Sequence, residues 1–179
     1  MNKPQQTEID TKWGQLKWLW LAVLVLVLDQ LSKWWALEAL TPYQPVNLMP
    51  GFNWKLAFNK GAAFSFLSES GGWQQVFFAL LAIIISTVML VWMRKMDAQQ
   101  SKLAIACSLV IGGAMGNLID RLYHGQVTDF IDWYYQSHHW PTFNVADSFI
   151  MLGAFIIALD GIFQPRKPDS QQSQTEHSK

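Results

Sequence analysis

Four apolar runs, each long enough to cross a bilayer, constrain this sequence more than any other feature. They span residues 18–37, 73–93, 103–122 and 143–163. A transmembrane helix needs about 20 consecutive and mostly apolar residues, because the hydrocarbon core of a bilayer is about 30 Å thick. The sequence therefore predicts a mainly α membrane protein with four transmembrane helices.

The composition agrees with a membrane protein and excludes some other classes. Charged residues make up only 15% of the chain, whereas about a quarter is usual in soluble domains. The net charge is zero, so there is no basic surface of the kind that binds nucleic acid. Cys107 is the only cysteine, which excludes an internal disulfide. Since it lies in an apolar run, we expect a small buried hydrophobic side chain.

Basic residues are distributed unevenly around the four runs. Nine of the 13 Lys and Arg residues lie in the N-terminal tail 1–17, the short loop 94–102 and the C-terminal tail 164–179. Cytoplasmic loops carry an excess of Lys and Arg, so both termini are predicted to be cytoplasmic. The C-terminal tail is polar and has no apolar periodicity, which predicts disorder. The chain would then consist of two tails around one four-span domain, residues 18–163.

The two longer connections are predicted to lie on the outer side of the membrane. In the first, Phe52, Trp54, Leu56 and Phe58 alternate with other residues, which is typical of strands, so we expect a small outer β-sheet cradle over about residues 43–70. In the second, apolar residues surround Asp129 and Asp132 in the segment "VTDFIDW". We expect this segment to form a helix on the membrane surface between spans three and four.

Two ionisable residues, Asp29 and Lys33, lie four residues apart in the first span and therefore share one helix face. One interpretation is an ion pair near the interface, with the Lys33 side chain reaching outward to water. The other is a supporting group that faces the interior of the bundle. Charges inside a membrane are costly, so both residues are functional candidates.

The third span ends in "GGAMGNLIDR", where Gly113, Asn117, Asp120 and Arg121 fall on roughly one face. Glycines at this position predict a close helix contact, and Asn117 could add an interhelical hydrogen bond. That interpretation explains the consecutive Asp120 and Arg121 less well. Arg121 carries a planar set of donors that suits a carbonyl or a carboxylate.

Asp147 follows Asn144 by three residues at the start of the fourth span. This spacing is typical of a helix N-cap with an acid in the first turn. Asp129 and Asp132, in turn, could be solvated loop charges. The four histidines fit no metal-binding motif, so no metal and no cofactor are predicted.

Four acids are nevertheless predicted near the outer ends of the spans: Asp29, Asp120, Asp129 and Asp147. Two carboxylates about 4 Å apart repel each other by roughly 4 kcal/mol at an effective dielectric constant near 20. One of them then keeps its proton, so that the charged acid can activate water and the neutral acid can donate to a carbonyl oxygen. The pattern alone leaves open which two acids pair.

Five segments together resemble the motifs of one known family: "DQLSK" at 29–33, "FNKGAAFSF" at 58–66, "GGAMGNLIDR" at 112–121, "VTDFID" at 127–132 and "FNVAD" at 143–147. Their order and the four-span layout are similar to those of lipoprotein signal peptidase, also called signal peptidase II. The resemblance covers about residues 29–163. It implies an aspartic endopeptidase of the bacterial inner membrane, with its active site near the periplasmic face. The sequence gives no clear sign of oligomerisation, and we expect a monomer. Its implied substrates are prolipoproteins that carry a diacylglyceryl-cysteine.

The resemblance also implies roles for individual residues. Asp129 and Asp147 correspond to the catalytic pair. The supporting and substrate-binding positions are Asn59, Gly61, Ala63, Asn117, Arg121, Asn144, Asp29, Lys33 and Asp120. Two rival interpretations use the same polar residues, namely a small transporter or proton relay and a membrane scaffold without enzymatic activity.

Overall fold

The computed structural model describes residues 13–61 and 73–163 and contains four long helices. They are α1 (Leu19–Ala39), α2 (Trp73–Lys95), α3 (Ser101–His124) and α4 (Val145–Phe163). Short 3₁₀ turns precede α1 (Leu16–Trp18) and α3 (Ala98–Gln100). All four helices are long and apolar enough to span a membrane, so the prediction of four spans is confirmed. The C-terminal tail, for which disorder was predicted, lies outside the described residues.

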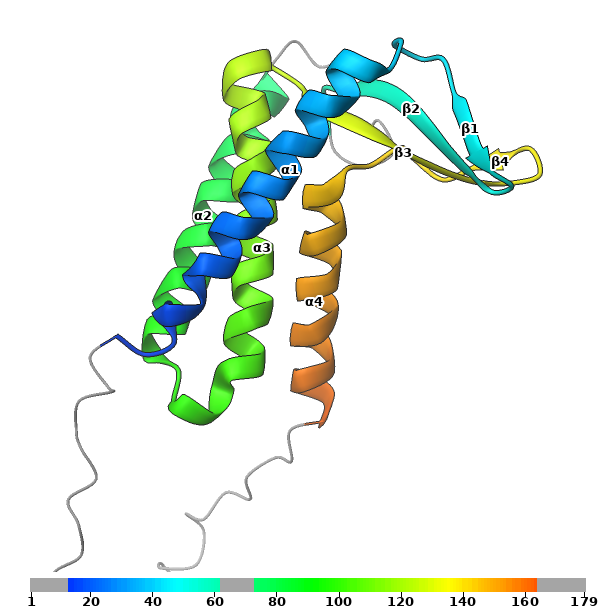
Figure 1. The fold of residues 1–179 in the computed structure, drawn as a ribbon. Coiled ribbons are helices and arrows are strands. Elements are labelled where there is room, and N and C mark those ends of the chain that lie inside the picture. The colour runs from blue at the N-terminus through cyan, green and yellow to red at the C-terminus, as the bar shows by residue number, and fades with distance from the viewer. Residues whose placement is uncertain (1–12, 62–72, 164–179) are drawn as a thin grey trace, which may run out of the picture.

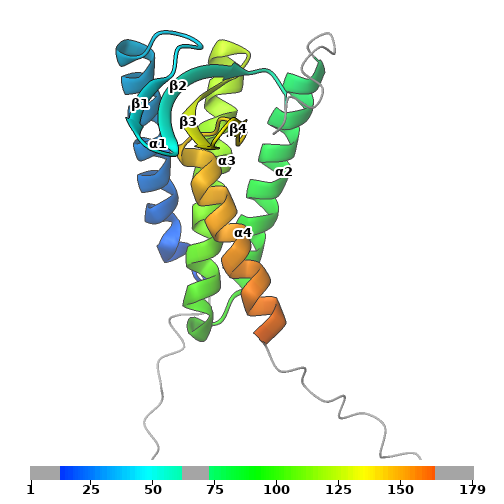
Figure 2. The same cartoon turned by 90° about the vertical axis from the view of Figure 1, so that its right-hand side faces the viewer.

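Helix α3 occupies the centre of the bundle, with the other three helices packed around it (Figures 1 and 2). Most of its side chains are buried, whereas α1, α2 and α4 expose apolar side chains such as Leu28, Val88 and Phe155. Such exposure would be costly in water. It is expected in lipid, where apolar side chains can face the acyl chains while each helix satisfies its backbone polar groups internally.

Two glycines of α3 allow this close packing. A Cβ atom at Gly112 would lie only 2.6 Å from the Ala22 oxygen of α1. A Cβ atom at Gly113 would collide with the backbone oxygen of Ala146 in α4. The close helix contact predicted from the glycines is therefore confirmed, and it involves helices on two sides of α3.

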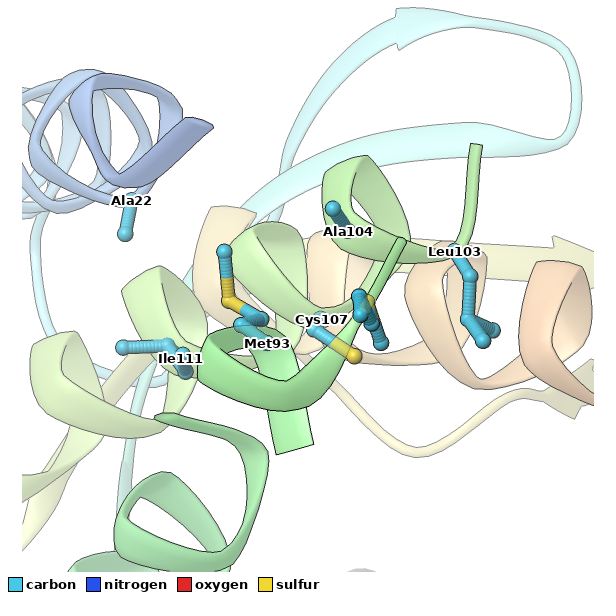
Figure 3. Close-up of a cluster of buried hydrophobic side chains, with 7 residues drawn as sticks. Ala22, Met93, Leu103, Ala104, Cys107 and Ile111 are labelled. Carbon is cyan, nitrogen blue, oxygen red and sulfur yellow. The ribbon is translucent and has the colours of Figure 1, made fainter. Parts of the chain in front are cut away.

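An apolar cluster fills the end of the bundle at which α2 connects to α3. Cys107 of α3 lies wholly buried in it, and the same cluster includes Met93 of α2 and Ala22 of α1 (Figure 3). The expectation of a buried cysteine is confirmed. Tight packing of this kind depends on shape and volume, since none of these side chains carries a charge.

An antiparallel sheet lies at the opposite end of the bundle, where α1 and α3 end and α4 begins (Figure 1). Its order is β1 (Val46–Met49), β2 (Phe52–Asn59), β3 (Val127–Tyr135) and β4 (His138–His139). The small sheet predicted from the first connection is confirmed. Part of the predicted range, residues 62–70, lies outside the described residues.

The predicted surface helix between spans three and four is wrong, because residues Val127–Tyr135 form strand β3. The segment is rich in β-branched and aromatic residues, which favour strands. It also finds a partner in β2, where Ala57 lies opposite Asp129 and Phe58 lies opposite Thr128. Apolar residues beside two acids indicated a surface segment correctly but did not distinguish a strand from a helix.

Strand β3 also pairs with the residues that lead into α4. The Ile131 N–H donates to the Phe143 oxygen at 2.8 Å, and the Phe143 N–H donates to the Ile131 oxygen at 3.1 Å. This bridge holds the middle of β3 against the residues just before α4. It therefore determines which side chains of the two segments become neighbours.

Candidate active site

A cluster of mostly buried polar side chains occupies the boundary between the bundle and the sheet. Two helices, one strand and the start of a third helix contribute to it. Its members are Asp29 and Lys33 from α1, Asn117 and Asp120 from α3, Asp129 from β3, and Asn144 and Asp147 at the start of α4. Such groups remain buried only if they are paired and hydrogen-bonded.

Lys33 is the central cation of this cluster and is only 3% exposed. Its Nζ lies 2.8 Å from Asp29 Oδ2 and 3.1 Å from Asp120 Oδ2, and it donates to Asn117 Oδ1 at 2.9 Å. The interpretation in which Lys33 reaches outward is therefore wrong, and Lys33 faces the bundle interior. Its three partners explain this, because a buried ammonium is tolerated only when its charge and its three donors are satisfied.

The two acids beside Lys33 also join separate elements. Asp29 Oδ1 accepts from the Ala146 N–H at 2.9 Å, in the first turn of α4, where backbone N–H groups have no partner within the helix. Asp120 Oδ2 accepts from the Thr128 N–H of β3, also at 2.9 Å. Gln30 donates to both acids and was missed from the sequence. A polar amide inside an apolar span was the signal that could have identified it.

Two amide side chains extend this network to the remaining acids. Asn117 Nδ2 donates to Asp147 Oδ1 at 2.8 Å, while Asn144 Nδ2 donates to Asp129 Oδ1 at 2.7 Å and to Asn117 Oδ1 at 3.1 Å. Since the Lys33 ammonium can only donate, it requires the oxygen of Asn117 on its own side. The Asn117 NH₂ group must then face Asp147.

The start of α4 is a reciprocal capping box. The Asp147 N–H donates to Asn144 Oδ1 at 2.9 Å, and the Asn144 N–H donates to Asp147 Oδ2 at 3.2 Å. This confirms the capping interpretation of Asn144 and Asp147. The same bonds fix the orientation of the Asp147 carboxylate, so capping and a chemical role are compatible.

Asp129 is not a solvated loop charge, because it is only 2% exposed. Its Oδ2 accepts from Asn59 Nδ2 at 3.2 Å, and the Asn59 oxygen accepts from the Gly61 N–H at 3.0 Å. Burial, reinforced by the negative charge of Asp147, raises the pKa of Asp129 to about 8. Near neutral pH, Asp129 therefore favours its protonated form.

Asp132 was also considered a solvated charge, and this interpretation is wrong as well. Only 1% of it is exposed. Asn53 donates to Asp132 Oδ2 at 2.9 Å, and His139 Nδ1 lies 2.9 Å from Asp132 Oδ1. Asp129 and Asp132 both belong to β3 but have separate hydrogen-bond partners. Within residues 13–61 and 73–163, no group of three or more His, Cys, Asp or Glu residues is arranged to hold a metal ion.

Two clefts meet at the polar cluster. The membrane-side cleft has a volume of about 610 Å³ and reaches helix residues, including Asn117, Arg121, Asp147 and Met151. The sheet-side cleft has a volume of about 580 Å³ and is lined by sheet and loop residues, among them Asp129. Asn59 and the segment 140–142 line both clefts. One acid of the cluster therefore borders each cleft.

Arg121 lies in the membrane-side cleft with part of its hydrogen-bonding capacity unused. Its Nη1 donates to the Asn117 backbone oxygen at 3.1 Å, and its guanidinium lies 5.2 Å from the ring centre of Phe78. Its Nε is buried and has no partner among the described residues. Ala63, also expected near the site, lies outside the described part of the chain.

Together, the fold and the site define a multi-pass membrane protein with buried acid–base groups at one end of its bundle. The signal peptidase (SPase) II family model matches residues 21–163. The chain therefore belongs to the signal peptidase II family, and the resemblance noted in its motifs is confirmed. Membership of this family implies a peptidase.

Individual relatives agree with this assignment. The chain is 53% identical over 156 residues to the lipoprotein signal peptidase of Aeromonas hydrophila subsp. hydrophila, covering 86% of this chain and 93% of the relative. It is 51% identical over 164 residues to that of Shewanella sp. strain MR-4, covering 92% and 95%. A bacterial membrane enzyme solved by the in meso method at 2.3 Å resolution has a similar fold, with a TM-score of 0.74 and 30% identity. The structural match covers 92% of this chain and 100% of that chain.

Proposed function

We propose that this protein is a membrane-embedded aspartic endopeptidase that removes the signal peptide from lipid-modified prolipoproteins. Cleavage would occur on the N-terminal side of the diacylglyceryl-cysteine. One observation carries the proposal: the side chain of Asn144 donates to Asp129 while its backbone N–H donates to Asp147. A single residue thus holds both carboxyl groups at the junction of two clefts.

In the proposed mechanism, the two carboxyl groups share one proton. Asp129 is the neutral acid at the start, because its pKa is raised to about 8. The charged Asp147 takes a proton from water as the water oxygen bonds to the scissile carbonyl carbon. Asp129 donates its proton to the carbonyl oxygen. When the tetrahedral intermediate breaks, Asp147 passes its proton to the leaving nitrogen, and Asp129 takes a proton back from a hydroxyl group of the intermediate. The C–N bond breaks, the products are a carboxyl group and an amine, and the pair returns to its starting state.

The surrounding polar residues would position the peptide. Arg121 has a buried donor without a partner in the described chain, at the wall of the membrane-side cleft. Such a donor suits a substrate carbonyl oxygen and would stabilise negative charge that develops near it. The carboxyl pair supplies both proton transfers, so the mechanism requires no metal or cofactor.

The proposed substrate and the membrane setting agree with each other. A signal peptide crosses the bilayer as a helix, so its cleavage point lies at the surface. The acyl chains of the modified cysteine could lie against apolar faces of the spans, where each buried CH₂ contributes about 0.8 kcal/mol. The distribution of Lys and Arg supports cytoplasmic termini and an active site near the periplasmic face of a bacterial inner membrane. We further propose that the protein acts as a monomer.

The rival interpretation as a transporter or proton relay is less well supported. A relay needs ionisable groups along its path through the bilayer. Here the acids Asp29, Asp120, Asp129 and Asp147 gather at one end of the bundle. The opposite end of α3 packs in an apolar cluster. A scaffold without activity would leave the two clefts at the acids unexplained.

One experiment tests the proposal directly. The purified protein in detergent is incubated with a prolipoprotein that carries a diacylglyceryl group on its cysteine, and the product masses are measured. We expect two products, separated at the bond before the modified cysteine. The same precursor without lipid is the control and should be cleaved much more slowly. Folded protein that leaves the lipidated precursor intact would refute the proposal. Strong inhibition by EDTA would exclude the metal-free mechanism.

A further inference from the structure

The sheet-side cleft differs from the membrane-side cleft in the elements that form it. Residues of β2, β3, β4 and the connecting loops line it, including Tyr43, Phe58 and Thr142, and within residues 13–61 and 73–163 no helix contributes to its lining. The membrane-side cleft, by contrast, includes Arg121 of α3 and Met151 of α4. Only one of the two clefts therefore lies wholly beyond the predicted membrane spans.

Two lysines, Lys55 and Lys60, line the sheet-side cleft. Neither of them forms an ion pair with any residue in the described part of the chain. The two acids of this cleft already have other partners, since Asp129 accepts from Asn59 and Asn144 and Asp132 is held by Asn53 and His139. Among the described residues, the cleft thus offers two ammonium groups that have no ion-pair partner.

The position of Lys55 follows from an irregularity in β2. The pairing register between β2 and β3 shifts between Trp54 and Ala57. At this bulge, Leu56 turns into the apolar core beneath the sheet, where it is almost completely buried, while Lys55 remains half-buried in the cleft. Bulges commonly redirect side chains next to functional sites, and here the bulge turns a lysine towards the cleft that holds Asp129.

We propose that the sheet-side cleft binds the residues that directly follow the modified cysteine, and that Lys55 and Lys60 make it selective for acidic side chains there. This inference rests on the proposed function. The scissile bond would lie at the two acids, between the clefts. The signal helix and the lipid belong with the cleft that reaches α3 and α4. The segment after the cysteine lies on the aqueous side of the scissile bond. It would therefore occupy the sheet-side cleft, which lies outside the predicted membrane spans.

The test compares three synthetic precursors that carry the same signal peptide and diacylglyceryl-cysteine. They differ only in the two residues after the cysteine, which are both Asp, both Asn or both Lys. Pairs of precursors compete in one reaction in a neutral detergent, and mass spectrometry gives the ratio of their kcat/KM values. We expect Asp to be preferred over Asn by about twofold to fivefold for each lysine engaged, and Lys to be the poorest substrate. The preference should shrink as added salt screens the charges.

Variants identify the source of this preference. Lys55→Gln and Lys60→Gln should each lower the Asp-to-Asn ratio, and the double variant should bring it close to one. Lys55→Arg keeps the charge and should retain the ratio. Lys102→Gln is the matched control, because Lys102 is exposed at the start of α3, at the other end of the bundle. Lys55→Glu together with Lys60→Glu should reverse the order and favour the Lys precursor.

Several outcomes would overturn the inference. One is a wild-type ratio of one for Asp against Asn while the Asn precursor is cleaved normally. This result needs no variant, so poor folding of a variant cannot obscure it. Another is an unchanged ratio in the double variant. A third is that an added anionic phospholipid lowers KM equally for all three precursors. That result would mean that both lysines bind anionic lipid and not the residues after the cysteine. If no precursor is cleaved at all, the proposed function fails instead.

Discussion

Helix α3 connects two buried clusters that are built in opposite ways. Towards its start, Cys107 and Ile111 pack with Met93 and Ala22 in a cluster of apolar side chains (Figure 3). Towards its end, Asn117 and Asp120 belong to a network of charges and amides. Both clusters include side chains of α1 and α3, and most of their members are buried. They differ in what each position requires of its side chain.

The apolar cluster depends on volume, and the polar cluster depends on direction. Dispersion contacts have little directionality, so a core tolerates changes that preserve its volume. A hydrogen bond in a buried network has a fixed donor and a fixed acceptor, and losing one partner leaves the other unsatisfied. The same helix therefore combines a tolerant half with a demanding half.

Replacing either proposed catalytic acid should have the largest effect on activity. Asp129→Asn or Asp147→Asn removes a proton-transfer group but keeps the size of the side chain. We expect turnover of a lipidated precursor to fall about 10³-fold or more, while thermal unfolding in detergent remains cooperative. A variant of either acid that retains near-normal turnover would show that the assigned pair is wrong.

Lys33→Met should be the most destabilising change in the polar cluster. It leaves Asp29 and Asp120 without their shared cation in a buried site. Breaking a buried ion pair by removing one partner typically costs about 3–5 kcal/mol. The free energy of unfolding in detergent measures this effect. Lys102→Met serves as the control, since its side chain is exposed, and should change stability little. Equal effects of the two variants would contradict the contrast.

The pH dependence of activity should reveal the proton on Asp129. As pH rises through about 8, Asp129 ionises, and the pair loses the acid that donates to the carbonyl oxygen. We expect kcat/KM to fall about tenfold for each pH unit above this value, measured in one detergent at constant ionic strength. A rate that remains constant to pH 10 would exclude a neutral Asp129 in the mechanism.

The same proton also links pH to stability. The folded chain holds it more tightly than the unfolded chain, since the pKa of Asp129 is raised from 3.8 to about 8. The stability associated with this group is therefore complete below pH 3.8 and is lost as pH rises through about 8. Asp129→Asn cannot ionise, so its loss of stability over this range should be smaller than that of the wild type.

Cys107→Ala should have the smallest effect. It removes one sulfur atom from the apolar cluster and leaves no polar group without a partner. We expect a loss of about 1 kcal/mol or less in the free energy of unfolding, from a small cavity. Turnover should remain within about twofold of the wild type. A loss of activity as large as that of Asp147→Asn would mean that the two halves of α3 are coupled.

Local patterns were sufficient to predict much of the fold. Hydropathy located the four spans, because the thickness of the bilayer sets their length. Alternation indicated the strand that became β2, and the spacing of Asn144 and Asp147 indicated a helix cap. The sequence pattern was insufficient at residues 127–135, where pairing with β2 stabilises a strand in place of the expected helix. It also missed the burial of Asp132, which depends on Asn53 and His139 from other strands.

Hydropathy was enough to identify a membrane protein and its spans, and five motifs were enough to indicate the family. Residue types alone left four acids as equal candidates, and only the resemblance singled out Asp129 and Asp147. Tertiary structure decided which groups are neighbours. Pairing between Ile131 and Phe143 brings Asp129 to Asn144, and packing of α1 against α4 brings Asp29 to the Ala146 N–H, 117 residues away. Periodicity describes neighbours along the chain, whereas the site depends on hydrogen bonds between segments that meet only after folding.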